Sequence, residues 1–126
     1  MLPKANNTAF SMTDPANDPS TATTTCSIKS TTGTTCLFAA TGAVTGSATY
    51  TWTASYEYGT TITHNQSGSS PNFAFTQTCG GPGATASGLE TPLNVTLTVT
   101  DSIGNVTTLQ SGTGNQPPLI IKFFSC

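Results

Sequence analysis

The feature that most constrains the fold is a run of alternating side chains late in the chain. Between residues 93 and 100 every second position is apolar, and each position between holds Asn or Thr; the apolar residues are Leu93, Val95, Leu97 and Val99. A period of two is typical of a β-strand with one face in a core and the other in water. These four residues are therefore predicted core residues, and the chain is predicted to be an all-β protein.

The same run ends in Asp101-Ser102-Ile103-Gly104-Asn105, which has the composition of a tight turn. An Asp side chain can accept hydrogen bonds from its own downstream backbone, and Gly tolerates a positive φ. We therefore predict that Asp101 caps this turn. The chain is then expected to return as an antiparallel strand over residues 105–110.

Short strands separated by turn residues are predicted along most of the chain. Their ranges are 24–29, 35–40, 48–58, 60–64, 72–78, 92–100, 105–110 and 119–125. The third range places Tyr50 and Trp52 on one side of its strand, and both are predicted core residues. Residues 65–71 and 80–88 are rich in Gly, Ser and Pro and are predicted loops. About seven or eight such strands indicate an antiparallel β-sandwich.

Residues 1–23 are predicted to form an arm outside the sandwich, which then occupies residues 24–126. Prolines interrupt this segment and its apolar residues are scattered. One interpretation is a flexible tail or linker. The other is a segment that docks on a neighbouring copy, with Leu2, Phe10 and Met12 as assembly anchors. The first residues contain no apolar segment of the kind found in a signal peptide.

Charged residues are scarce, at 6% of the chain, against about a quarter in an ordinary soluble domain. Threonine instead supplies about a fifth of the residues, so hydroxyl groups are expected to cover the outer faces of the sheets. The net charge of −2 and the lack of a basic patch argue against binding to nucleic acid or to an anionic membrane surface. No apolar stretch approaches the length of a membrane span, so no membrane insertion is expected.

Four cysteines in a short chain rich in Thr, Gly and Pro suggest two disulfides and an oxidising, extracellular location. Of the three pairings that four cysteines allow, we favour Cys26 with Cys36 and Cys79 with Cys126. Each of these bonds would tie a segment to its neighbour in a sheet. Buried free thiols are the alternative. A four-cysteine zinc site is disfavoured because no C-x₂-C pair occurs, and no cofactor or metal is expected.

Two motifs resemble the pattern of PKD domains. The first is Tyr50-Thr51-Trp52, and the second has the spacing V-x-L-x-V-x-D-x-x-G-N from Val95 to Asn105. The resemblance covers roughly residues 24–110 and implies an immunoglobulin-like sandwich in which the two motifs pack face to face. The chain departs from the pattern after Trp52, where PKD domains usually have a Gly-Asp-Gly turn. Other immunoglobulin-like and fibronectin-like sandwiches remain alternatives.

Residues suited to catalysis or metal binding are few and dispersed. His64 is the only histidine, and Glu57 and Glu90 lie in different segments. These residues predict neither a nucleophilic triad nor the carboxylate pair of a glycosidase, so the protein is not expected to be an enzyme. Asp14 and Asp18 are a weak basis for a calcium site.

Three functions follow from these features. The leading hypothesis is a non-catalytic extracellular structural or adhesion module, which assembles with a protein partner or with itself on a cell surface or filament. The first alternative is a carbohydrate-binding module, in which Tyr56 and Tyr58 face the polysaccharide and stack on its sugar rings. The second alternative is a virion surface (decoration) protein, although cytoplasmic assembly fits poorly with four cysteines.

Overall fold

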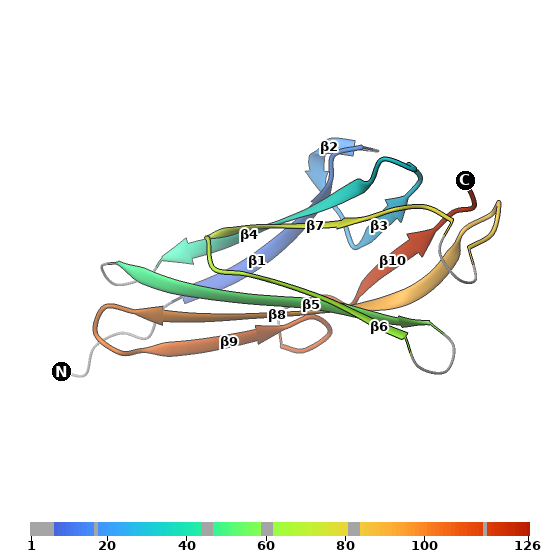
Figure 1. Ribbon diagram of the computed structural model, residues 1–126. Helices are drawn as coiled ribbons and strands as arrows, with labels where there is room; N and C mark the ends of the chain where they lie inside the picture. The colour runs from blue at the N-terminus through green and yellow to red at the C-terminus, as the bar shows by residue number, and fades with distance from the viewer. Residues whose placement is uncertain (1–6, 17, 44–46, 59–61, 81–83, 115) are drawn as a thin grey trace.

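The chain folds into ten β-strands arranged in two sheets (Figure 1). The computed structural model describes residues 7–16, 18–43, 47–58, 62–80, 84–114 and 116–126. Within its strands, it does not describe the side chains of residues 7, 18–20, 43, 57–58 and 62–67. In the described segments there is no helix that could cross a membrane. The prediction of an all-β protein with two sheets is confirmed.

The first sheet contains four strands in the order β2-β1-β4-β7, all paired antiparallel. Their bounds are Asp18–Ala22 for β2, Asn7–Asp14 for β1, Thr34–Ala43 for β4 and Asn72–Gln77 for β7. In Figure 1 this sheet forms the upper layer of the molecule.

The second sheet contains six strands, with the path β3-β10-β8-β5-β6 and with β9 also paired to β8. Their bounds are Thr25–Ile28 (β3), Ala48–Tyr58 (β5), Ile62–Gly68 (β6), Leu89–Asp101 (β8), Val106–Gln110 (β9) and Leu119–Phe123 (β10). The pairing of β3 with β10 is parallel and the others are antiparallel. Because β8 is long, β10 pairs with its first part and β9 with its second part.

The two motifs that resemble PKD domains lie in neighbouring strands of one sheet. Trp52 of β5 is directly opposite Leu97 of β8 in the antiparallel ladder. The expectation that the motifs face each other across the sandwich is therefore wrong. Side chains from both motifs nevertheless point into the same core, because opposite residues of paired strands lie on the same face of the sheet.

Strand β5 has the bounds predicted from its alternation, whereas β6 continues to Gly68 through part of a predicted loop. The glycine is required at this position because a Cβ there would lie 2.7 Å from the ring of Phe73. The polar residues of β6 provide no apolar alternation, which is why the sequence suggested a loop.

The predicted N-terminal arm is in fact part of the sandwich, since β1 pairs with β4 from Asn7 to Thr13. Phe10 and Met12 are 6% and 2% exposed and belong to the hydrophobic core of their own chain. The boundary predicted at residue 23 is therefore wrong. Leu2 lies outside the described residues.

The core is centred on Trp52, whose side chain is fully buried. Its ring lies 5.7 Å from that of Phe10, 6.0 Å from Phe38 and 5.8 Å from Phe73, measured between centroids. The indole Nε1 donates a hydrogen bond to the carbonyl oxygen of Ser70 at 2.6 Å. The predicted core residues that are buried are Trp52, Leu93, Val95, Leu97 and Val99, while Tyr50 is partly buried against the core.

Both disulfides link the two sheets. Cys26 of β3 is bonded to Cys36 of β4, and Cys79, which follows β7, is bonded to Cys126, which follows β10. These are the pairs favoured from the sequence, and no described cysteine is free. The expected geometry was wrong, however, because each bond crosses between sheets instead of joining neighbours within one sheet.

Asp101 caps the turn between β8 and β9, as predicted. Its Oδ1 accepts hydrogen bonds from the backbone N–H groups of Ile103 (3.1 Å) and Asn105 (2.9 Å), and its Oδ2 accepts one from Asn105 Nδ2 (2.9 Å). Burial alone would raise the pKa of this carboxyl. The hydrogen bonds from Asn105, Ile103 and Gly104 outweigh that effect, so the pKa lies below its ordinary value.

Candidate functional site

The outer face of the four-stranded sheet is a surface of small residues around one exposed leucine. Alternate residues of β1, β4 and β7 point away from the core and form what we call the Leu37 face: Ala9, Ser11, Thr13, Thr35, Leu37, Ala39, Thr41, Asn72, Ala74 and Thr76. None of these residues is charged. Hydroxyl groups link the strands, with Thr35 Oγ1 2.8 Å from Thr76 Oγ1. The face is therefore neutral.

Leu37 is 43% exposed and stands beside a shallow hollow in this face. The hollow has a volume of about 250 Å³ and is lined by Ser11, Thr13, Leu37, Phe38, Ala39 and Asn72. Pockets for small organic ligands usually measure roughly 300–1,000 Å³ and enclose the ligand. A smaller hollow on an exposed sheet is better suited to receive a side chain from another protein surface.

The outer face of the six-stranded sheet has a different chemistry. Its central strands carry rows of threonine, in which Thr49, Thr51 and Thr53 of β5 lie opposite Thr100, Thr98 and Thr96 of β8. Hydroxyl groups in such rows hydrogen-bond readily with water. The Leu37 face, in contrast, combines a leucine and three alanines with its hydroxyl groups, so less polar surface must be desolvated when it is covered.

The surface charges that the structure describes gather at one end of the six-stranded sheet. Lys122 Nζ lies 3.7 Å from Glu90 Oε1, and the Nζ atoms of Lys29 and Lys122 lie 5.0 and 5.5 Å from the ring centroid of Phe124. Phe124 therefore has two cation contacts of the cation–π type. The described surface charges therefore lie outside the Leu37 face.

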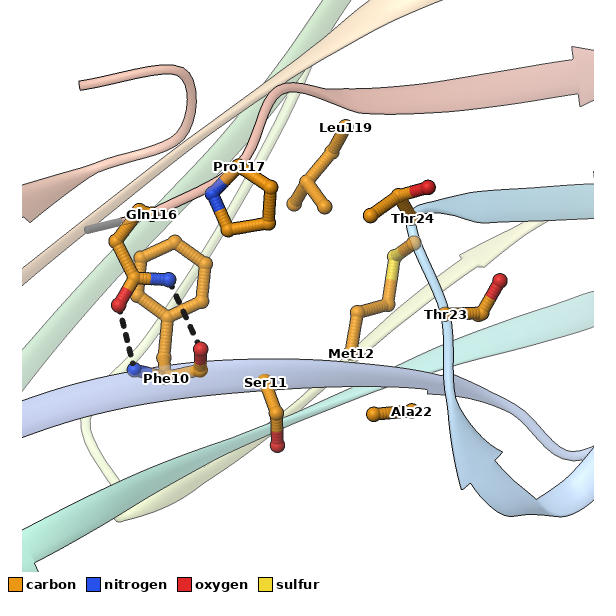
Figure 2. Close-up of a pocket in the computed structure, with 9 residues that line it drawn as sticks. All are labelled: Phe10, Ser11, Met12, Ala22, Thr23, Thr24, Gln116, Pro117 and Leu119. Carbon is orange, nitrogen blue, oxygen red and sulfur yellow. Dashed lines mark hydrogen bonds between the residues drawn. The ribbon is translucent and has the colours of Figure 1, made fainter. Parts of the chain in front are cut away.

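Figure 2 shows a groove between the edge of β1 and the segment that leads into β10. Its volume is about 160 Å³, and its residues are Phe10, Ser11, Met12, Ala22, Thr23, Thr24, Gln116, Pro117 and Leu119. Phe10, Met12 and Leu119 are largely buried and make the groove apolar. The groove is too small for an ordinary organic ligand.

Gln116 closes the backbone edge of β1 at this groove. Its Oε1 accepts a hydrogen bond from Phe10 N at 3.0 Å, and its Nε2 donates one to Phe10 O at 2.9 Å (Figure 2). The side-chain amide thus makes the two bonds that a neighbouring strand would make. Gln116 is 6% exposed, and the sequence offers no local signal for this role because its partner lies 106 residues away.

Replacing Gln116 with alanine is expected to lower the free energy of unfolding by about 1–3 kcal/mol, because Phe10 would keep a largely buried N–H and C=O without these partners. Urea unfolding followed by circular dichroism measures the change. Gln110→Ala is the matched control, since Gln110 is exposed on β9 and its loss should change stability by at most about 0.5 kcal/mol. Equal effects of the two substitutions would contradict the role assigned to Gln116.

Tyr56 does not lie on a ligand-facing surface. It is 2% exposed, its hydroxyl donates a hydrogen bond to Gln77 Oε1 at 2.8 Å, and its ring centroid is 4.8 Å from that of Phe123. Burial raises the pKa of Tyr56 to about 12. The expectation that Tyr56 stacks on a sugar is therefore wrong, and the side chain of Tyr58 lies outside the described residues.

The remaining candidate residues do not form a site in the described part of the chain. Asp14 is 3% exposed, and its Oδ2 accepts a hydrogen bond from Ser27 N at 2.9 Å. No group of three or more His, Cys, Asp or Glu residues capable of holding a metal occurs among the described residues. The side chains of Asp18, Glu57 and His64 are not described.

Comparisons with protein-family models, with curated proteins and with solved structures found no significant match to this chain. The physical features of the surface therefore carry the functional argument.

Proposed function

We propose that this protein is a non-catalytic extracellular module of immunoglobulin-like, PKD type that takes part in protein–protein assembly. The observation that carries the proposal is the Leu37 face, which is neutral and holds an exposed leucine beside a hollow. The buried centres of protein interfaces are depleted of charged residues and resemble protein interiors in their packing. The Leu37 face offers such a surface without a charge that must be desolvated.

The path of the chain supports the immunoglobulin-like assignment. In immunoglobulin domains the strands A, B and E share one sheet and C, F and G share the other. Here β1, β4 and β7 follow the first arrangement, and β5, β8 and the pair β9 and β10 follow the second. The first strand is divided, because β1 pairs antiparallel with β4 while β3 pairs parallel with β10.

The two disulfides support an extracellular location. Disulfides persist in oxidising compartments and are rare in the reducing cytosol. Each bond joins the four-stranded sheet or its following segment to the six-stranded sheet or its following segment. They therefore suit a module that must keep its two sheets together outside the cell.

The proposal is tested on native material from its source by measuring the disulfide state and the size of the assembly together. Non-reducing mass spectrometry should find both disulfides intact, and light scattering should give a mass greater than that of one chain. Free thiols would overturn the extracellular assignment. A native particle with the mass of a single chain would overturn the assembly role.

A further inference from the structure

The sheet edges of this protein differ in how their backbone hydrogen-bonding groups are covered. An uncovered edge strand presents a row of N–H and C=O groups that can pair with another chain, and proteins protect such edges in several ways. Among the described residues, side chains cover the edges of β3 and β1. On β7 the first outward N–H, that of Asn72, donates to Ser70 Oγ at 3.3 Å, an exposed contact that pairing would displace, whereas no described side chain is placed on the backbone of Ala74 at the centre of the strand.

On β3, alternate N–H groups point away from β10. The orientation follows from Ile120 N and Phe124 N, which donate to the carbonyl oxygens of Thr24 and Ile28 across the parallel pair. A side-chain oxygen accepts from each outward N–H. The pairs are Thr25 N with Thr23 Oγ1 (3.2 Å), Ser27 N with Asp14 Oδ2 (2.9 Å) and Lys29 N with Thr34 Oγ1 (3.3 Å).

The edge of β1 is covered by a side chain and by the chain itself. Gln116 binds both the N–H and the C=O of Phe10, and Thr23 N donates to the carbonyl oxygen of Met12 at 2.8 Å. These contacts occupy positions where an added strand would have to bind. A second chain could pair with β1 or β3 only by displacing these partners.

Strand β7 forms the opposite edge of the four-stranded sheet (Figure 1). Ala40 N donates to Pro71 O at 2.9 Å, and this bond shows which opposite pairs of the antiparallel β4–β7 ladder are hydrogen-bonded. Because hydrogen-bonded pairs alternate in such a ladder, Ala74 presents its N–H and C=O away from β4. Ala74 is exposed and is placed at the middle of the edge.

The usual protective devices are also missing from β7. Its sequence, Asn72 to Gln77, contains no proline and no charged residue, and its register with β4 runs without a bulge. Proline, lysine and bulges are the features by which natural edge strands discourage pairing. The strand alternates buried Phe73 and Phe75 with exposed side chains, so only its backbone and its small polar or apolar residues face a partner.

We propose that β7 pairs antiparallel with β7 of a second copy of this chain, about a two-fold axis at Ala74. This inference rests on the proposed assembly function and names the partner and the contact. In this register Ala74 of the two copies would exchange both backbone hydrogen bonds, and Asn72 would lie opposite Thr76 of the second copy. The two four-stranded sheets would become one eight-stranded sheet with adjacent Leu37 faces.

The chemistry of the edge favours a second copy as the occupant. An antiparallel strand paired with itself about a two-fold axis is self-complementary, since each donor that it presents meets the matching acceptor. Such an axis brings identical side chains together, and β7 carries no charge that would repel its counterpart. The residue on the axis is alanine, which is small enough not to obstruct the approach of the two backbones.

Analytical ultracentrifugation of the purified, disulfide-bonded chain tests the proposal. We expect a reversible dimer and expect Ala74→Pro to raise its Kd by about tenfold or more, because proline removes the outward N–H and obstructs pairing. Thr108→Pro is the matched control. Thr108 is the central residue of edge strand β9, and because Asp101 N donates to Asn105 O, its N–H points away from β8. Strand β9, like β7, contains no proline and no charged residue, so this control also tests whether β9 is the contact; the proposal requires that the variant dimerises normally.

A cysteine series tests the register independently of proline and its effect on folding. Mild oxidation of Ala74→Cys should give a covalent dimer, since opposite residues of a hydrogen-bonded antiparallel pair have Cα atoms about 5.5 Å apart, within the range of a disulfide. Asn72→Cys should not cross-link to itself, because the two sites would be four residues apart, or about 13 Å.

Three outcomes would overturn the pairing of β7. They are a wild-type protein that stays monomeric, a dimer that Ala74→Pro leaves unchanged, and cross-linking of Asn72→Cys that equals that of Ala74→Cys. The proposed function is judged separately on native material. A disulfide-bonded native assembly together with any of these results would retain the assembly function and reject β7 as its contact.

Discussion

Replacing Trp52 with alanine is expected to lower the free energy of unfolding by about 3–5 kcal/mol, the usual cost of deleting a large buried aromatic side chain. The indole is fully buried and contacts aromatic rings of the opposite, four-stranded sheet, including Phe10 of β1 and Phe73 of β7. Small domains are stable by only about 5–15 kcal/mol, so the variant should be close to unfolding. Urea denaturation followed by far-ultraviolet circular dichroism measures the loss.

Two further variants separate the contributions of Trp52. Trp52→Phe keeps an aromatic ring in the core but removes the hydrogen bond from Nε1 to Ser70 O, so its loss should be smaller than that of the alanine variant. Val106→Ala is the surface control, because Val106 is 62% exposed and should change stability by at most about 0.5 kcal/mol. A Trp52→Ala variant as stable as this control would contradict the central position of the indole in the core.

The strands that could be predicted from the sequence are those whose signal is local. Strand β5 and the apolar face of β8 show a clear period of two, and both are placed as the alternation requires. The turn after β8 was equally predictable, because the chemistry of Asp101 and Gly104 acts within five residues. Such signals need no knowledge of distant parts of the chain.

The features that could not be predicted depend on contacts between distant segments. Strand β1 has only two large apolar residues, Phe10 and Met12, in a segment flanked by prolines. It becomes a strand because β4 pairs with it and Trp52 packs on Phe10. Gln116 likewise gains its role only when the fold brings β1 beside it, and an isolated glutamine in a loop gives no such signal.

The position of Tyr56 shows a different limit of sequence reasoning. Its parity with Trp52 was correctly identified, but the sequence does not specify how far along β5 the core extends. In the structure Phe75 and Phe123 lie against the Tyr56 ring, with centroid distances of 6.0 and 4.8 Å. Side chains of β7, in the four-stranded sheet, and of β10, in the same sheet as β5, therefore cover more of β5 than the pattern alone indicated, and Tyr56 belongs to the core.

Removing the disulfide between Cys79 and Cys126 is expected to cost about 4 kcal/mol, from the loop-closure entropy that a bond of this span removes from the unfolded chain. The two residues are separated by 47 positions, and the bond holds the end of the chain just after β10. The double variant Cys79→Ala/Cys126→Ala, compared with the wild-type protein in urea, measures the loss. In the wild-type protein a reductant should break this bond before the bond between the fully buried Cys26 and Cys36, because Cys126 is exposed. The loss of stability in this first step should resemble that of the double variant.

Comparison with the bond between Cys26 and Cys36 separates two contributions to the loss of stability: the loop-closure entropy of the unfolded chain and the packing of the buried sulfur atoms in the folded protein. Its span of 10 residues predicts a smaller entropic contribution, about 3 kcal/mol, but both cysteines are fully buried between the sheets. Loss of this pair should therefore add a packing cost, and Cys26→Ala/Cys36→Ala should destabilise by more than loop closure alone predicts. If the Cys79 and Cys126 variant lost little stability, the last strand would have to be held by its pairing with β3 and β8 and by the burial of Ile121 and Phe123, without help from the disulfide.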